Sequence, residues 1–374
     1  MKLQLTRSNI KMSFGYIGCL MIFLSLGFTG VCQSKSLNNL AVSANYQTGF
    51  SLPEYSIFTL ITDDYIRAFE LSITQQTLGK TEWEQSYNFP AHGLSLYYSN
   101  LGNDDILGKE LALNYFLKLY LLSKGKFRLY NVTAGGIGYV NKTFDMETNY
   151  LNVVVGSHFN LHFNLKFGAN YELSKKLSIN TGMSFNHFSN ANTASPNIGV
   201  NTFTGYAGLS YVIGDKEELN DFSFNKHVPK NEFFLFAGVG GKHTQSLSSI
   251  YYLTSSLSFE ARRSITRGFH LGVGMDVYYD SSVKSELLKD NRVHKGQYDF
   301  QTGIHISPAL VYNKFSVALY QGVYVGFQEK VGRNTLYNKG VLQFNIYKNI
   351  TLRAVMKSHL HILDYPEFGV GMKF

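Results

Sequence analysis

Apolar and polar residues alternate with a period of two over long stretches of this chain. From Leu161 to Tyr171, every second residue is apolar, and the residues between them are polar, basic or glycine. A similar alternation recurs over residues 269–280 and 315–327. Successive side chains of a strand point to opposite faces, so each run predicts a strand with one apolar and one polar face.

These runs exceed ten residues. Strands of soluble proteins usually have about five or six residues, whereas a tilted strand that crosses a bilayer needs about 9–11. Short turns such as 123–126 and 174–176 alternate with longer polar loops such as 142–152 and 188–201. Outer-membrane β-barrels have this asymmetry, with short periplasmic turns and long external loops. We therefore predict an all-β, antiparallel transmembrane β-barrel in the outer membrane of a Gram-negative cell.

The number of runs predicts about 14–16 strands, with about eight of them before Gly214 and an even total. A charged segment at 215–230 separates a first barrel region, 33–214, from further strands at 231–374. This segment is either a periplasmic loop within one barrel or a linker between two eight-stranded units. We favour the single barrel because two barrels in one chain are rarer. The chain ends on Phe374 with the apolar parity, as outer-membrane barrels typically do, and this resemblance implies recognition by the barrel-assembly machinery.

The N-terminal residues 1–32 are predicted to be a secretory signal peptide. A basic stretch, an apolar run and small residues follow one another there. A transmembrane anchor is the alternative, but nothing later in the chain resembles a helical membrane span. A lipoprotein signal would use Cys32, but the bulky Val31 precedes it. Both cysteines of the chain fall in this segment, so the mature protein has no pair for a disulfide.

The composition supports a barrel and excludes one class of partner. Aromatic residues make up 15% and charged residues only 16% of the chain, whereas about 25% of an average soluble protein is charged. The formal net charge of +8 includes three basic residues of the predicted signal peptide, which leaves +5. No block of lysine and arginine is present, so nucleic acid is not a predicted partner.

The stretch FNHFSNAN at 185–192 contains the candidate chemistry. The apolar parity of the strand that begins at Leu177 continues through His187 and Ser189. Both side chains are therefore predicted to face outward, near the external end of the strand, within hydrogen-bond reach of each other. Polar groups on a lipid-facing surface cost free energy unless they have partners or a function. An interfacial pair at the level of the lipid headgroups is the alternative reading.

Three segments resemble a known family. His187-Phe-Ser189-Asn190-Ala191, then Pro196-Asn197-Ile-Gly199, and a strand ending Gly208-Leu-Ser-Tyr211 are similar to the signature of PagL-type lipid A 3-O-deacylases, or acyloxyacyl hydrolases. The likeness spans roughly residues 90–214, and the chain after 230 resembles only outer-membrane barrels in general. The resemblance implies a carboxylic ester hydrolase without a cofactor. Its substrate would be an acyl ester of lipid A, in lipopolysaccharide, in the outer leaflet.

The resemblance also implies roles for single residues. Ser189 corresponds to the nucleophile and His187 to the general base that activates it. Asn190 and Asn197 match conserved asparagines and are candidates for the oxyanion hole, together with a backbone N–H near Ala191 or Asn192. Two phenylalanines, 185 and 188, are candidates for an acyl groove, although ordinary lipid contact is the simpler reading of each.

The chain departs from the family twelve residues after Ser189, where the family has a glutamate and this sequence has Asn201. An antiparallel hairpin would bring Asn201 beside His187, and its carbonyl could orient the imidazole without supplying a charge. Three outcomes follow from this departure. Catalysis is slower than with the family's glutamate, an acid in a neighbouring loop (Asp145 or Glu147) replaces it, or the protein is a pseudoenzyme.

Two other classes of protein are alternatives to a deacylase. A non-catalytic porin, transporter or adhesin with a vestigial motif is the main alternative, whereas a soluble lipocalin-like binder fits the strand lengths poorly. A homodimer is an open possibility. No metal site is predicted, because the His158/His162 and His359/His361 pairs lack a clear carboxylate partner, and the acidic run 103–105 lacks further ligands.

Overall fold

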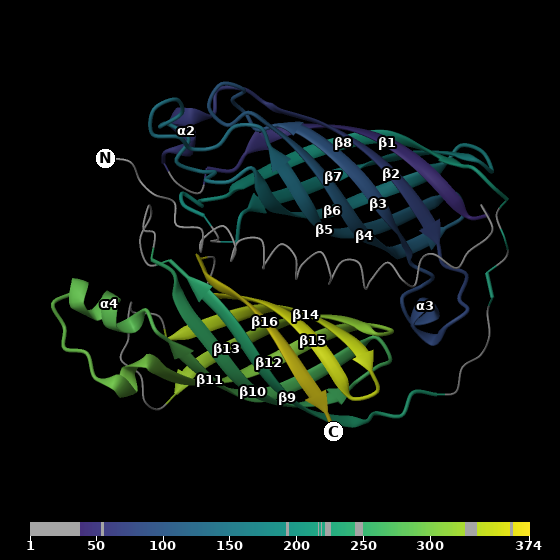
Figure 1. The fold of residues 1–374 in the computed structure, drawn as a ribbon. Coiled ribbons are helices and arrows are strands. Elements are labelled where there is room, and N and C mark those ends of the chain that lie inside the picture. Colours follow the sequence, from purple (N-terminus) through teal and green to yellow (C-terminus); the bar gives the residue numbers. More distant parts are fainter. Residues whose placement is uncertain are drawn as a thin grey trace. The chain divides into compact units, whose positions relative to one another are not determined.

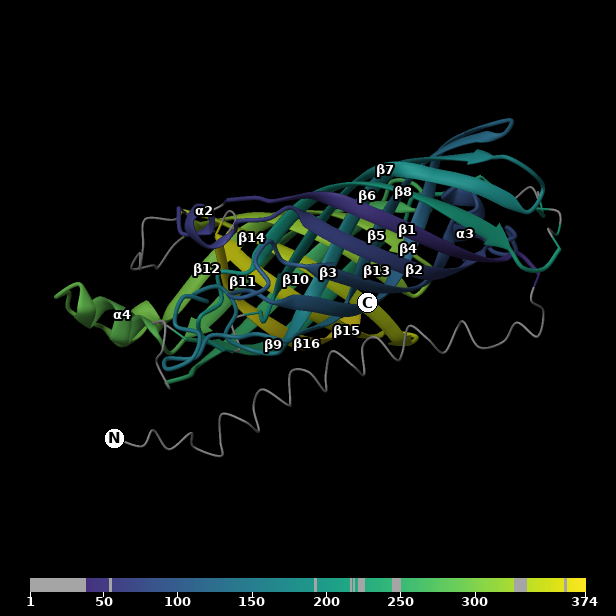
Figure 2. The ribbon, with the colours of Figure 1, turned by 90° about the horizontal axis from the view of Figure 1, so that it is seen from above.

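A computed structural model of the chain describes residues 38–53, 56–191, 194–215, 217, 219–220, 226–243, 250–325, 335–359 and 362–374. The predicted signal peptide at 1–32 lies outside the described residues. In the described part, the strands form two closed antiparallel barrels of eight strands each (Figure 1). The strands of each barrel are tilted relative to its long axis, as barrel closure requires (Figure 2).

The N-terminal barrel consists of β1 (Leu40–Ser51), β2 (Ile66–Gln76), β3 (Ala91–Asn100), β4 (Lys109–Lys124), β5 (Phe127–Val140), β6 (Phe159–Glu172), β7 (Leu177–Ser189) and β8 (Val200–Val212). The C-terminal barrel consists of β9 (Asn231–Lys242), β10 (Tyr252–Ser264), β11 (Phe269–Asp280), β12 (Phe300–Tyr312), β13 (Phe315–Val325), β14 (Leu336–Tyr347), β15 (Ile350–His359) and β16 (Ile362–Lys373). The short helices are α2 (Phe58–Ile61), α3 (Glu82–Ser86), α4 (Val283–Lys289) and the 3₁₀ helix η1 (Gly296–Asp299). Within the described ranges, no helix has the length and apolar character needed to cross a membrane.

The all-β antiparallel class and the predicted range of 14–16 strands are confirmed. The strands close in the alternative arrangement, two eight-stranded units, and the favoured single barrel is wrong. The reason is the pairing of β1 with β8, which runs from Ala41↔Val212 to Ser51↔Thr202. This pairing uses both edges of the first eight strands, so no edge is left to which β9 could add. β9 pairs instead with β16.

The two faces of the N-terminal barrel differ as the alternation predicts. On β7, Met183 faces outward and is 60% exposed, while its neighbour Ser184 is buried in the lumen. The lumen holds polar side chains that bond to each other, such as Asn164, whose amide donates to Ser184 Oγ at 2.7 Å and to Asn186 Oδ1 at 2.7 Å. An apolar outer face and a hydrogen-bonded interior are what a barrel in a bilayer needs.

An apolar cluster closes the loop-bearing end of the N-terminal barrel, where β7 ends and β8 begins. It joins side chains of α2, of the β3–β4 and β5–β6 loops, and of the strand ends, namely Phe58, Ile61, Leu101, Leu107, Val140, Val154, Val155, Phe188 and Val200. Because these side chains are close-packed, the loops above them are held in fixed positions.

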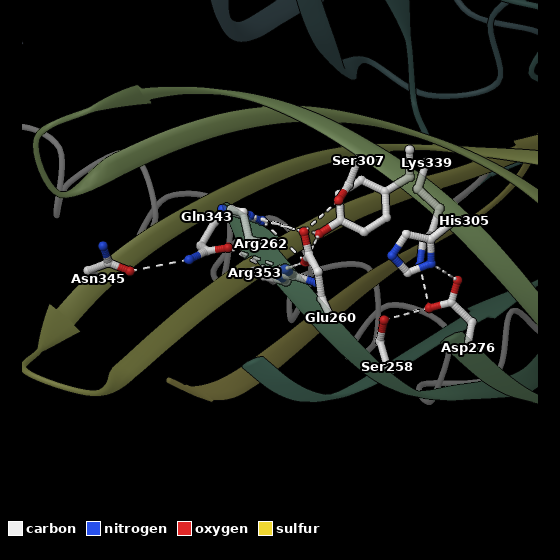
Figure 3. Close-up of polar contacts among 11 residues, drawn as sticks. Ser258, Glu260, Arg262, Asp276, His305, Ser307, Lys339, Gln343, Asn345 and Arg353 are labelled. Atoms are coloured by element: carbon white, nitrogen blue, oxygen red, sulfur yellow. Dashed lines mark hydrogen bonds and ion pairs between the residues drawn. The ribbon is translucent and has the colours of Figure 1, made fainter. Parts of the chain in front are cut away.

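Paired charges fill the lumen of the C-terminal barrel (Figure 3). The Glu260 carboxylate lies 2.7 Å from Arg353 and 3.0 Å from Arg262, and Asp276 lies 2.7 Å from Lys339. All five side chains are almost fully buried. Buried charges are tolerated only when they are compensated in this way, so the pairs tie strands from different sides of the barrel together.

Candidate active site

The candidate active site lies where β7 passes into β8 through the loop at residues 190–199. In the register of this hairpin, His187 is directly opposite Asn201, and Phe185 is opposite Phe203. The alternation of β7 puts His187 and Ser189 on the outer face, as their parity predicts. The residues of the opposite parity, Asn186 and Phe188, are buried. Local sequence and hairpin register therefore place three polar side chains on one outward patch.

These three side chains form a hydrogen-bonded row. His187 Nδ1 lies 2.6 Å from Asn201 Oδ1, and His187 Nε2 lies 3.0 Å from Ser189 Oγ. With the amide oxygen of Asn201 facing it, Nδ1 carries the ring proton and donates it. Nε2 is then a bare acceptor that faces the serine hydroxyl. This is the tautomer that a histidine needs in order to take a proton from serine.

Burial increases along the row away from the nucleophile. Asn201 is only 7% exposed, whereas His187 and Ser189 are half-buried. The imidazole is thus anchored at its buried side, and the hydroxyl remains open to a molecule that arrives from outside the barrel.

The loop after Ser189 brings both predicted oxyanion residues together, but most of their polar groups bond within the loop. The backbone N–H of Asn190 donates to Asn197 Oδ1 at 2.9 Å, and the Asn190 amide donates to the Ala194 carbonyl at 3.0 Å. The Asn190 backbone and side chain therefore hold the described part of this loop together, with Asn197 Oδ1 as one of the acceptors. Ala191 adopts a positive φ of 52° beside it.

Gly199 closes the loop against the site. Its φ is +77°, and a Cβ added there would lie 3.2 Å from His187 Cε1 and 3.2 Å from Ser189 Cβ. Both the backbone conformation and the close approach favour glycine at this position. Any side chain would press on the histidine and the serine at the same time.

The β5–β6 loop supports the active-site loop from its other side. The backbone of Val155 forms a bridge with Asn197, and Ile198 N–H donates to the Val154 carbonyl at 3.1 Å. Asn152, which is fully buried, holds this support in place. Its Oδ1 accepts the Val155 N–H at 3.1 Å, and its Nδ2 donates to the Ile106 carbonyl at 3.0 Å. The sequence carries no signal for Asn152, because a single asparagine in a polar loop is ordinary.

The two acids considered as substitutes for the family glutamate lie in the β5–β6 loop. Asp145 Oδ1 accepts the backbone N–H groups of Thr148 at 2.7 Å and Glu147 at 3.0 Å. These bonds, the one from Thr148 first, lower the pKa of the Asp145 carboxyl. Asp145 thus stabilises its own turn, and the residue that bonds to His187 Nδ1 is Asn201.

One of the remaining sequence candidates, Phe188, occupies a different place from the one considered for it. Phe188 is 1% exposed and packs inward in the apolar cluster, so it cannot line an outward groove with Phe185. Its even position in the alternation is the physical reason. Among histidines, Nδ1 of His162 lies 2.9 Å from Asn114 Oδ1 and Nε2 of His359 lies 3.0 Å from the Tyr324 hydroxyl.

The residues considered and rejected as metal ligands form no cluster in the part of the chain that the structure describes, where no three side chains of histidine, cysteine, aspartate or glutamate gather. His158 Nδ1 lies 2.8 Å from the Val140 carbonyl, and His361 lies outside the described residues. Asn103 Oδ1 accepts the backbone N–H groups of Asp105 and Ile106. The acidic run at 103–105 is therefore held in a loop turn.

A closed antiparallel barrel with an apolar outer face and a polar interior defines the class, an outer-membrane β-barrel protein. The family model described as lipid A 3-O-deacylase (PagL) matches residues 67–210. The model described as acyloxyacyl hydrolase, C-terminal domain (PagL_C), matches residues 231–374. The chain belongs to the PagL family. The second match corrects the sequence reading, because residues 231–374 are themselves a domain of this family and not only a generic barrel.

Comparisons with individual proteins add little to the family match. No curated protein sequence matches the chain. Neisserial surface protein A (NspA) is 9% identical, with a TM-score of 0.31 over 46% of this chain and 96% of its own. CdiB from Acinetobacter baumannii is 10% identical, with a TM-score of 0.20 over 90% of this chain and 60% of its own. Omp33 from Acinetobacter baumannii is 9% identical, with a TM-score of 0.16 over 90% and 97%. These scores carry no argument about the chain.

Proposed function

We propose that the protein hydrolyses an acyl ester of lipid A in the outer leaflet of the outer membrane, by 3-O-deacylation or a related remodelling of lipopolysaccharide. The observation that carries this proposal is the hydrogen-bonded row Asn201–His187–Ser189 on the outer face of the barrel. It lies inside the segment that matches the lipid A 3-O-deacylase family. A nucleophile on the lipid-facing side can reach an ester that never leaves the membrane.

Ser189 and His187 divide the chemistry between them. His187 Nε2 accepts the hydroxyl proton while Ser189 Oγ attacks the ester carbonyl carbon. The tetrahedral intermediate collapses when the histidine returns this proton to the departing sugar oxygen, which leaves an acyl-enzyme. Water, activated by the same Nε2, then hydrolyses the acyl-enzyme and releases the fatty acid. No cofactor takes part in either step.

Asn201 takes the place of the family's acid in this scheme. Its carbonyl oxygen, 2.6 Å from Nδ1, holds the imidazole in the productive tautomer and orientation. It supplies no negative charge to the imidazolium that forms in the transition state. In the Ser-His-Asp proteases, an amide in place of the acid costs roughly ten-thousand-fold in turnover, mainly through a wrong tautomer. Here the oxygen faces the ring, so only the loss of charge remains.

The developing oxyanion is stabilised by donors from the 190–199 loop. Asn197 Nδ2 is the side-chain donor, and the backbone N–H of Ala191 is the second. Asn190 contributes by fixing the loop through its own bonds to Asn197 and Ala194. Such preorganised donors are usually a large part of the rate enhancement in acyl transfer.

Mass spectrometry of lipid A tests the proposal. The protein is expressed in the outer membrane of a Gram-negative host, and lipid A is extracted from cells carrying wild type, S189A or S178A. Ser178 lies on the same strand at its other end, so S178A is the matched control. We expect loss of one hydroxyacyl chain with wild type and S178A, and none with S189A. Intact lipid A beside a folded wild-type protein would reject the proposal.

A non-catalytic barrel is the second candidate, and one observation favours it. Asn201 removes the acid that the family uses, as would happen in a protein that has lost its activity. Unchanged lipid A in the same experiment would support a porin, transporter or adhesin role.

Organisation and biogenesis are further parts of the proposal. Residues 33–214 would be the catalytic unit, 215–230 a periplasmic linker and 231–374 the second barrel unit. The terminal Phe374 would be read by the barrel-assembly machinery.

A further inference from the structure

The lumen of the N-terminal barrel opens into a wide cavity at the end opposite the candidate active site. We call this cavity the turn-side cup. It has a volume of about 410 Å³ and is bounded by the β4–β5 and β6–β7 turns, the β2–β3 loop and the segment after β8. Ser178 lines the cup, and His187 lies nine residues further along the same strand. At about 3.3 Å per residue, about 30 Å separate the two places.

Cations outnumber acids in the cup and in the narrower cavity beneath it, of about 40 Å³, which shares Lys118 with the cup. Together the two linings hold five cationic and three acidic side chains, which are Lys118, Arg128, Lys166, Lys175, Lys176, Glu70, Glu172 and Glu217. Five positive and three negative charges leave a formal excess of +2. A concave, low-dielectric wall concentrates the field of such an excess, so the cup attracts anions.

Two of the three acids are already bound by neighbouring cations. Glu70 forms a buried ion pair with Lys166, and Glu172 lies 2.8 Å from Arg128. Neither pair includes Lys118. Each pair neutralises its own two charges, and neither pair compensates the charge of Lys118.

Lys118 is the cation that the described lumen leaves without an acid. Its Nζ lies 3.8 Å from the ring centroid of Tyr130 and 5.7 Å from that of Tyr120, and no carboxylate of the described residues forms a salt bridge with it. Cation–π contacts stabilise an ammonium by only about 0.5–2 kcal/mol and satisfy none of its N–H donors. The Lys118 side chain as a whole is half-buried and lines a cavity that is open to water.

The rest of the lining suits an anion that carries further polar groups. Amide and hydroxyl side chains line the cup together with Lys118, among them Asn88, Asn170, Gln76 and Ser43. An ammonium that serves as a point charge among neutral donors is a common way to bind phosphate. We propose that the turn-side cup is a binding site for an oxyanion, a phosphate or carboxylate group, with Lys118 as its principal contact. Short turns of outer-membrane barrels face the periplasm, so the ligand would come from that side.

Equilibrium dialysis against radiolabelled inorganic phosphate tests the site directly. The full-length mature protein is placed in phosphatidylcholine nanodiscs as wild type, K118M, K118R and K124M. Lys124 is an exposed lysine at the end of the same strand and outside the cup, which makes it the matched control. We expect saturable binding by wild type, K118R and K124M, and affinity at least about tenfold weaker in K118M.

A second arm of the dialysis experiment distinguishes a lipid headgroup from a soluble phosphate as the natural ligand. In this arm the nanodiscs contain phosphatidylglycerol. If this lipid weakens the binding of free phosphate to the wild type but not the residual binding to K118M, the natural ligand is a lipid headgroup. If it has no effect, the ligand is a soluble phosphate.

Migration of the unheated, folded barrel in gels confirms that K118M is intact. Absence of saturable binding by the wild type, or equal affinity in K118M, would overturn the proposal.

Discussion

Replacing Asn201 by aspartate tests whether the row needs only orientation or also a charge. Aspartate has the same shape and would keep an oxygen at the 2.6 Å position beside His187 Nδ1. It would add a negative charge about 4 Å from the centre of the imidazolium that forms in the transition state. Two unit charges at 4 Å attract by about 4 kcal/mol at an effective dielectric constant of 20.

His187 is only half-buried, so solvent screens this attraction. We therefore expect the added charge to stabilise the transition state by about 2 kcal/mol. A gain of this size is about a thirty-fold increase in kcat. Removal of the side chain, as in N201A, leaves the imidazole without an orienting acceptor. We expect N201A to lower kcat about tenfold or more.

The assay is a time course of deacylation of purified lipid A in detergent micelles, followed by mass spectrometry. Each variant is first checked for the gel shift between the folded and the heated barrel. A higher rate in N201D together with a lower rate in N201A supports the assigned row. If N201D is no faster and N201A no slower than the wild type, His187 does not act through residue 201, and the reasoning is refuted.

Three further predictions concern the support of the site and the second barrel. G199A should reduce deacylation at least about tenfold with a folded barrel, because its Cβ would press on the catalytic pair at a positive φ; normal turnover would contradict this. N152A should lower the free energy of unfolding by about 2–3 kcal/mol in urea titrations, because it removes the hydrogen bonds of a fully buried side chain. An unchanged free energy of unfolding would show that these hydrogen bonds do not stabilise the loops. E260Q should destabilise the C-terminal barrel by about 3–5 kcal/mol, since Arg262 and Arg353 lose their counter-charge. Lipid A turnover should stay at the wild-type level in E260Q, and a loss of turnover would argue against a site confined to the N-terminal barrel.

Local features of the fold were accessible from the sequence, whereas closure was not. Alternation along Leu161–Tyr171 predicts a strand whichever barrel it belongs to, because every strand of either barrel has the same two faces. One barrel of sixteen strands and two of eight give the same pattern. The choice depends on the pairing of β1 with β8, which joins residues more than 150 positions apart and has no local signal.

The candidate site shows the same division between local and distant information. Parity placed His187 and Ser189 outward, and hairpin geometry placed Asn201 opposite the histidine. The same parity rule puts Phe188 inside the barrel, so its candidacy for a groove could have been rejected from the sequence. Asn152 could not have been found, since its role depends on three loops that meet only in the folded structure.

The role of Ser189 as nucleophile is tested most directly by the covalent acyl-enzyme that it would form with a chain from lipid A. Purified protein is mixed with lipid A, quenched in acid within the first turnovers, digested and analysed by mass spectrometry. We expect a peptide that contains Ser189 with the added mass of one hydroxyacyl group, and no such adduct in S189A, which also leaves lipid A intact. Deacylation of lipid A by S189A at the wild-type rate would show that Ser189 is not the nucleophile.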